Sequence, residues 1–147
     1  MSKTKQIDVK CPQCGQTKRL DYWESINVDL DSSLRTQLFD GQINFFHCES
    51  CKYEAFINGP LLYRDMTRKF CIQYLPEHWL EDAANFDSYG TDGSVETYLN
   101  FSAMGIEHLA RPHVVFNMEE LLRYIVFREL LYDRNMAEQE SVAHVLH

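Results

Sequence analysis

Lysine is absent from this 147-residue chain after Lys69, and this absence divides the charge unevenly. Residues 71–147 carry four arginines against thirteen acidic residues, a formal charge of −9, whereas residues 1–70 are nearly neutral at +1. Non-specific binding to nucleic acids and to anionic membranes depends on positive potential. The net charge of −8 therefore disfavours both kinds of partner for the chain as a whole.

Long apolar runs are also missing. No uncharged apolar stretch approaches the roughly 18 residues that a membrane span requires. The first ten residues have no apolar segment behind their charges, as a secretory signal would. We therefore expect a cytoplasmic protein without a membrane partner.

The sequence lacks the motifs of common enzymes. It holds no G-x-S-x-G, Walker A, G-x-G-x-x-G or H-E-x-x-H pattern, and glycine occurs only six times. A zinc deaminase would need an H-x-E motif, which is also absent. The carboxylates of the second half occur singly or in short pairs, as on a solvated surface. We therefore expect no enzymatic activity.

The most informative feature is a set of five cysteines, four of which form two C-x-x-C pairs: Cys11 with Cys14, and Cys48 with Cys51. In a reducing compartment, such close pairs are more typical of metal ligands than of disulfides. Four thiolates complete the tetrahedral coordination of a structural Zn²⁺ and leave no position for an activated water. Iron can be held by the same four ligands and is a possible substitute.

A thiol-redox role for Cys11 and Cys14 is a lesser alternative. A redox C-x-x-C pair lies at the N-terminus of a helix, and the residues after Cys14 do not have a helical pattern. Redox chemistry would also leave the second pair unexplained. The fifth cysteine, Cys71, lies in an apolar segment and is predicted to be a buried, inert thiol.

Two residues beside the second pair are candidates for contacts outside the ligand set. His47 precedes Cys48 and could bind an outer atom of the site. Lys52 stands where the first pair has Gly15, and its charge could offset the negative zinc–thiolate centre.

The hydrophobic pattern predicts extended segments on both sides of each cysteine pair and two more after Gly59-Pro60. They are Gln6–Lys10, Thr17–Asn27, Ile43–His47, Tyr53–Ile57, Leu61–Met66 and Lys69–Leu75. Residues 95–101 also have an extended pattern, but the sequence assigns no role to residues 87–110.

Three helices are predicted. Asp31 or Ser32 can cap a short helix that ends at Gly41, and Pro76 begins another that extends to Phe86. The strongest helical pattern runs from Met118 to Asp133. For this helix, Asn117 is the N-cap and Glu120 completes a capping box. Its apolar residues exceed one stripe, which predicts burial on two sides, within the domain or partly in a homodimer.

These elements predict one domain, residues 1–135, followed by a helical or flexible tail, residues 136–147. The expected fold class is α+β. We expect a zinc-ribbon-like antiparallel β-sheet, elaborated with a short helix and a long C-terminal helix.

Several of these segments together resemble the CpXC domain of bacteria and archaea. The resemblance covers about Asp8 to Arg134. It is carried by the two cysteine pairs with Gly15, the segment Gly59–Asp65, and the helix residues Leu121-Leu122-Arg123, Arg128-Glu129 and Asp133. The second pair departs from the pattern because Glu49 stands where proline is expected. The resemblance implies a zinc-ribbon-like fold and marks only the four paired cysteines as ligands.

We therefore expect a zinc-stabilised protein-interaction module whose partner, a basic protein, binds the acidic second half. A nucleic-acid interface is the alternative, because basic residues gather near the cysteine pairs with aromatic residues among them. The basic candidates are Lys10, Lys18, Arg19 and Lys52.

Overall fold

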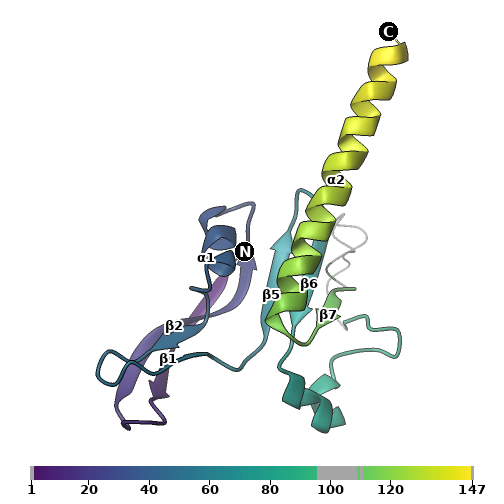
Figure 1. The fold of residues 1–147 in the computed structure, drawn as a ribbon. Coiled ribbons are helices and arrows are strands. Elements are labelled where there is room, and N and C mark those ends of the chain that lie inside the picture. Colours follow the sequence, from purple (N-terminus) through teal and green to yellow (C-terminus); the bar gives the residue numbers. More distant parts are fainter. Residues whose placement is uncertain (1, 96–108, 110, 147) are drawn as a thin grey trace.

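The computed structural model describes residues 2–95, 109 and 111–146 (Figure 1). Most of the expected extended segment 95–101 therefore lies outside the described residues. None of the described helices combines the length and the apolar content of a membrane span.

A five-stranded sheet forms the centre of the molecule, with strand order β1-β2-β5-β6-β7. Its strands are β1 (Lys3–Lys10), β2 (Thr17–Asn27), β5 (Leu61–Asp65), β6 (Phe70–Tyr74) and β7 (His113–Val115). The pairs β1/β2 and β5/β6 are antiparallel, as tight turns require, whereas β2/β5 and β6/β7 are parallel. The α+β class is confirmed, but the sheet is mixed rather than antiparallel, because two long crossovers return the chain to the same end of the sheet.

The first crossover contains a second, two-stranded sheet. Strands β3 (Phe45–His47) and β4 (Glu54–Phe56) pair in antiparallel fashion on either side of the second cysteine pair. The crossover also contains helix α1 (Ser33–Phe39), which buries Leu34 and Leu38. Helix α1 ends as predicted at Gly41, whose amide donates to the Leu38 carbonyl at 3.1 Å.

The expected helix from Pro76 to Phe86 is instead two short 3₁₀ helices, η1 (Glu77–Glu81) and η2 (Ala83–Phe86). Asp82 separates them with an extended backbone, and its carboxylate accepts the Ala84 amide at 3.0 Å. Asp82 thus acts as an N-cap in the middle of the predicted helix, which ends the first helical turn and begins the second.

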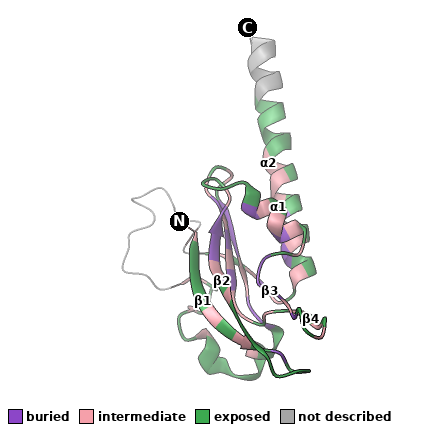
Figure 2. Ribbon diagram, turned by 90° about the vertical axis from the view of Figure 1, so that its left-hand side faces the viewer, coloured by how far each residue is buried: buried purple, intermediate pink, exposed green. Residues whose placement is uncertain are grey.

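Helix α2 (Met118–Leu146) begins as predicted, with the Asn117 side chain accepting the Glu120 amide at 2.8 Å. It continues past the predicted end at Asp133, and its C-terminal half projects beyond the sheet (Figures 1 and 2). Leu121 and Ile125 are fully buried against the sheet. By contrast, Phe127 is 52% exposed and Leu130 is 63% exposed, so the helix buries one side only within the described part of the chain.

Two hydrophobic cores result. The larger core lies between the sheet and the two helices and includes Ile26, Tyr63, Phe70, Ile72 and Leu121. The smaller core surrounds Phe46 and contains two of the cysteines. The metal-site candidates therefore lie away from the main core, in a region with few apolar side chains of its own.

Candidate metal centre

The two cysteine pairs lie in turns with the same backbone hydrogen bonds. The Gly15 amide donates to the Cys11 carbonyl at 2.9 Å, and the Lys52 amide donates to the Cys48 carbonyl at 2.8 Å. Each turn is also closed by a second hydrogen bond, from the amide of its first cysteine to the carbonyl of the residue two positions after its second cysteine. The acceptors are Gln16 and Tyr53, both at 2.8 Å.

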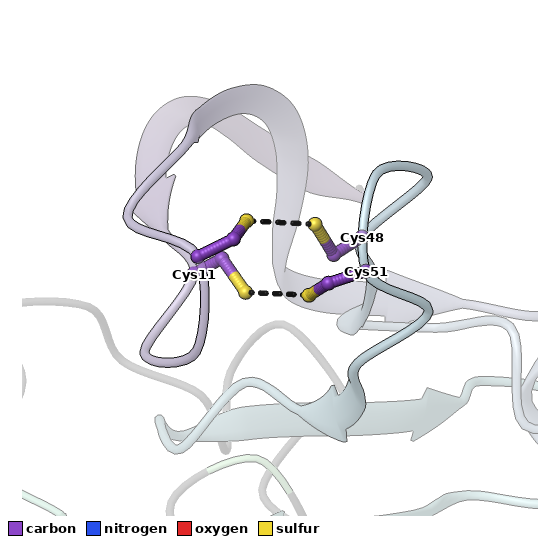
Figure 3. Close-up of side chains that lie close together, drawn as sticks. Cys11, Cys48 and Cys51 are labelled. Atoms are coloured by element: carbon purple, nitrogen blue, oxygen red, sulfur yellow. Dashed lines mark hydrogen bonds between the residues drawn. The ribbon is translucent and has the colours of Figure 1, made fainter.

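These turns face each other and bring the four sulfur atoms together. Figure 3 shows the side chains of the two turns directed toward one another. All four Sγ atoms lie within 4.8 Å of one another, and the pairs Cys11–Cys51 and Cys14–Cys48 are each 3.5 Å apart. A tetrahedral site with Zn–S bonds of about 2.3 Å has sulfur–sulfur edges of about 3.8 Å. The arrangement therefore fits a single tetrahedral metal ion.

Backbone amides point at the sulfur atoms in the same pattern in both turns. The Cys51 and Ser50 amides donate to Cys48 Sγ, and the Tyr53 amide donates to Cys51 Sγ. In the first turn, the amides of Cys14 and Gln13 donate to Cys11 Sγ. Donors of this kind stabilise thiolates, so the backbone prepares these sulfurs to carry negative charge.

The pKa values of the two thiols in the second turn are shifted in opposite directions. The Cys51 amide is the main cause that lowers the pKa of the Cys48 thiol to about 6. Cys51 receives a hydrogen bond from the Tyr53 amide, but burial and the neighbouring sulfurs together outweigh it and raise the pKa of its thiol to about 12. Four thiolates cannot form side by side without a compensating cation. A divalent ion bound at this point would remove the conflict.

The site is more open on one side than on the other. Cys11 and Cys48 are buried in the smaller core, Cys51 is half-buried, and Cys14 is exposed. Phe46, a residue of β3 in the second sheet, packs with this buried pair. A bound metal would therefore join the β1–β2 hairpin to the β3–β4 sheet across a core too small to hold them strongly by itself.

The two predicted outer residues are adjacent in sequence to the ligands Cys48 and Cys51, and the His47 ring contacts another side chain. His47 Nδ1 lies 2.8 Å from the carboxylate of Glu54 on the neighbouring strand. The backbone carbonyl of His47 accepts the Lys18 ammonium at 3.3 Å, which joins the hairpin to the second turn. Lys52 is exposed and has a left-handed backbone, with φ of +66°.

The remaining basic candidates lie along the β1–β2 hairpin. The Cε atom of Lys10 is 3.8 Å from where a Cβ on Gly15 would be, so its side chain lies over the first turn. Arg19 is opposite Asp8 in the β1–β2 ladder. Lys18 is already engaged with the second turn. The basic residues are thus near the site, but they do not form a surface free of acidic groups.

One contact between the turns had no sequence signal. The Ser50 hydroxyl donates to the Gln16 side-chain carbonyl at 2.5 Å. Both residues are common in loops, so only the three-dimensional structure reveals that they meet. Away from the site, Cys71 is buried, and burial is the main cause that raises the pKa of its thiol to about 11, in line with the prediction of an unreactive thiol.

Comparison with known proteins gives one positive result. No curated protein and no solved structure matches the chain. A family model described as CpXC protein matches residues 9–139, a range that contains all four clustered cysteines and every described strand except most of β1. The chain therefore belongs to the CpXC family.

Proposed function

We propose that the protein is a zinc-stabilised interaction module without enzymatic activity. The observation that carries the proposal is the meeting of four Sγ atoms within 4.8 Å of one another at the ends of two hydrogen-bonded turns. Four thiolates fill the coordination of zinc, so no position remains for a reactive water. The role of the metal is then to fix the two turns, and through them the hairpin and the second sheet.

Zinc is the proposed ion because four thiolates in tetrahedral geometry suit it. Iron bound by the same ligands is the competing occupant. Thiolate ligands must stay reduced, which is why we place the protein in the cytoplasm.

The proposed partner is a protein with a basic surface. Residues 71–147 carry a formal charge of −9, and none of these charged residues belongs to the metal site. Exposed acidic residues of this half include Glu77, Glu81 and Asp82 on the 3₁₀ segment and Glu119 on α2. A surface with charge of one sign favours association with a partner surface of the opposite sign.

The test combines metal analysis with partner capture. Protein purified from its native source should contain one zinc per chain, and a Cys14→Ser/Cys48→Ser variant should contain none. Cross-linking in the native cells, followed by mass spectrometry, should join the wild-type second half to a basic protein. Wild-type protein that carries no metal would contradict the proposal, and so would cross-links confined to acidic proteins.

Nucleic-acid binding is the second candidate, supported by Lys10, Lys18 and Arg19 on the hairpin beside the metal centre. Such binding would weaken steeply with salt, because phosphate contacts release counterions. A mobility shift with single-stranded RNA or DNA at about 50 mM salt would support this candidate. The absence of a shift under those conditions would remove it.

A further inference from the structure

The outermost strand of the main sheet, β7, presents backbone groups to an edge with which no described strand pairs. The Leu75 amide donates to the Val115 carbonyl at 3.0 Å, which fixes Val115 as a residue that bonds inward to β6. In a parallel ladder, alternate residues direct their N–H and C=O groups to opposite sides. The N–H and C=O of Val114 therefore point outward, and no described residue is hydrogen-bonded to them.

Beside this edge lies a groove of about 420 Å³ between β7 and the first turns of α2. Its walls include the rings of His113, Tyr124 and Phe127. The His113 ring lies flat on the Tyr124 ring, with centroids 3.8 Å apart and planes 3° apart. With Phe127 52% exposed, the groove offers an aromatic surface large enough for one or two side chains.

The groove also contains an under-used carboxylate. Glu120 lines it, and the one hydrogen bond that this carboxylate accepts from a described residue is a long one, 3.5 Å from the Phe116 amide. Arg123 also lines the groove, but its guanidinium is already paired with Glu119 at 3.0 Å. Glu120 is thus able to receive a cation from a partner, in agreement with the acidic character of this half of the chain.

We propose that an extended segment of a basic partner protein adds as a strand to the edge of β7. Its backbone would bond to Val114, and alternate side chains would enter the groove. An apolar side chain would pack on Tyr124 and Phe127, and a lysine or arginine would reach Glu120. This inference rests on the proposed function, because it gives the basic partner a docking site on the acidic half.

A second copy of the chain is a less suitable occupant. Pairing of two β7 edges would bring the two copies of Glu120 toward each other, and like charges at an interface disfavour it. The occupant we commit to is therefore an extended segment that carries an apolar and a basic residue at successive groove-facing positions, two residues apart. Dimerisation through β7 remains a distinct result that the experiment can detect.

The experiment measures binding of two labelled decapeptides to the full-length, metal-loaded protein by fluorescence anisotropy. In the first peptide, Phe and Lys occupy every second position in turn, with Thr between them, so that one face of the strand carries both, and in the second peptide Glu replaces every Lys. We expect the basic peptide to bind and the acidic peptide not to bind. Equal binding of both peptides, or of neither, would overturn the inference.

The deciding variant is Val114→Pro. Proline removes the outward N–H but no inward hydrogen bond, and an edge strand tolerates it when that N–H faces away from the sheet. We expect it to weaken the basic peptide at least about tenfold, the equivalent of one lost hydrogen bond, whereas the matched control Val114→Ala binds like wild type. Equal affinity of the Val114→Pro and Val114→Ala variants would exclude strand addition.

Two exposed positions keep the test decisive if Val114→Pro does not fold. Phe127→Ser removes an aromatic wall, and Glu120→Gln removes the charge but keeps an acceptor for Phe116. Each should weaken the basic peptide about three- to tenfold, in line with loss of one aromatic contact or one ion pair. Unchanged affinity in both variants would contradict the groove as the binding site.

Failure of this inference is separable from failure of the proposed function. If the protein contains zinc and cross-links to a basic protein outside β7 and α2, the interaction module stands and the groove does not. Light scattering of the free protein identifies the remaining occupant. A dimer that Val114→Pro converts to a monomer would assign the edge to a second copy and overturn the peptide proposal.

Discussion

Gly15 and Lys52 occupy equivalent positions in the two cysteine turns, and both have a left-handed backbone, with φ of +76° and +66°. Each donates its amide to the carbonyl of the first cysteine of its turn. Glycine adopts this conformation without strain, whereas a residue with a Cβ pays about 1 kcal/mol or more. The first turn is therefore relaxed and the second is strained.

This difference predicts opposite effects of two substitutions. Gly15→Ala should lower the free energy of unfolding by about 1–2 kcal/mol through backbone strain, because the nearest atom to its new Cβ is a flexible lysine carbon at 3.8 Å. Lys52→Gly should leave the stability unchanged or raise it by up to about 1 kcal/mol. Denaturant unfolding measures both.

Lys69→Gly is the matched control for Lys52→Gly. Lys69 also has a left-handed backbone, with φ of +57°, but it lies in the β5–β6 turn, away from the metal centre. Both variants should relieve similar strain. If Lys52→Gly weakens zinc retention against a chelator and Lys69→Gly does not, the charge of Lys52 supports the thiolate centre. If both variants retain zinc equally well, the role of Lys52 is limited to the turn.

Gly59 is required because of its contact with Tyr22. A Cβ at position 59 would lie 2.3 Å from the Tyr22 hydroxyl, which donates to the Pro60 carbonyl at 2.5 Å. Gly59→Ala should therefore displace the ring and cost about 1–3 kcal/mol. In a Tyr22→Phe background the added cost should be smaller, and strictly additive effects in the double-mutant cycle would argue against the contact.

Asn44 joins the second sheet to the main sheet. Its buried side chain accepts the Trp23 amide at 2.7 Å and donates to the Trp23 carbonyl at 2.9 Å, as a neighbouring strand would. Asn44→Ala should cost about 2 kcal/mol because both backbone groups lose their partner. The exposed Asn85, which makes one hydrogen bond to the Trp79 carbonyl, is the control, and Asn85→Ala should cost under about 0.5 kcal/mol. Equal costs would refute this bridging role.

Asp29 makes the stability depend on pH. Burial would raise the pKa of its carboxyl, but hydrogen bonds from the Thr67 hydroxyl and from the Met66 and Thr67 amides outweigh burial and hold the pKa below its usual range. A lowered folded-state pKa contributes stability above the unfolded value of about 3.8, and this contribution is lost as the pH falls through the folded value.

The check is a comparison of wild type with Asp29→Asn from pH 7 to pH 3. We expect the variant to be less stable at pH 7 and the difference between the two proteins to shrink below about pH 4. Metal loss in acid affects both proteins alike, so the difference isolates Asp29. A difference that stays constant over the whole range would show that the carboxylate charge has no part in it.

Local sequence signals were sufficient for the features they encode. The spacing within each C-x-x-C pair predicted two metal ligands, and the four-coordinate preference of zinc predicted that the two pairs meet. The caps at Asn117 and Gly41 predicted where one helix begins and another ends. These signals work because a few adjacent residues determine the backbone there.

Features that depend on distant residues could not be predicted in this way. The parallel pairing of β2 with β5 depends on the path of the intervening crossover, and the anchoring of Trp23 by Asn44 depends on a contact between separate sheets. The number of apolar residues on α2 suggested burial on two sides. The exposed face of α2 is apolar instead, and the composition of a helix alone does not reveal whether an apolar face is buried or exposed.

The proposed metal ion holds the two cysteine turns together. The most direct measurement is the thermal midpoint before and after metal removal, with elemental analysis of the same samples. Because site binding energy is folding energy and the core around Phe46 is small, removal should lower the midpoint by at least about 10 °C, roughly 3 kcal/mol for a chain of this size, and Zn²⁺ should restore it. An identical midpoint with and without metal would show that no metal ion holds the two turns together.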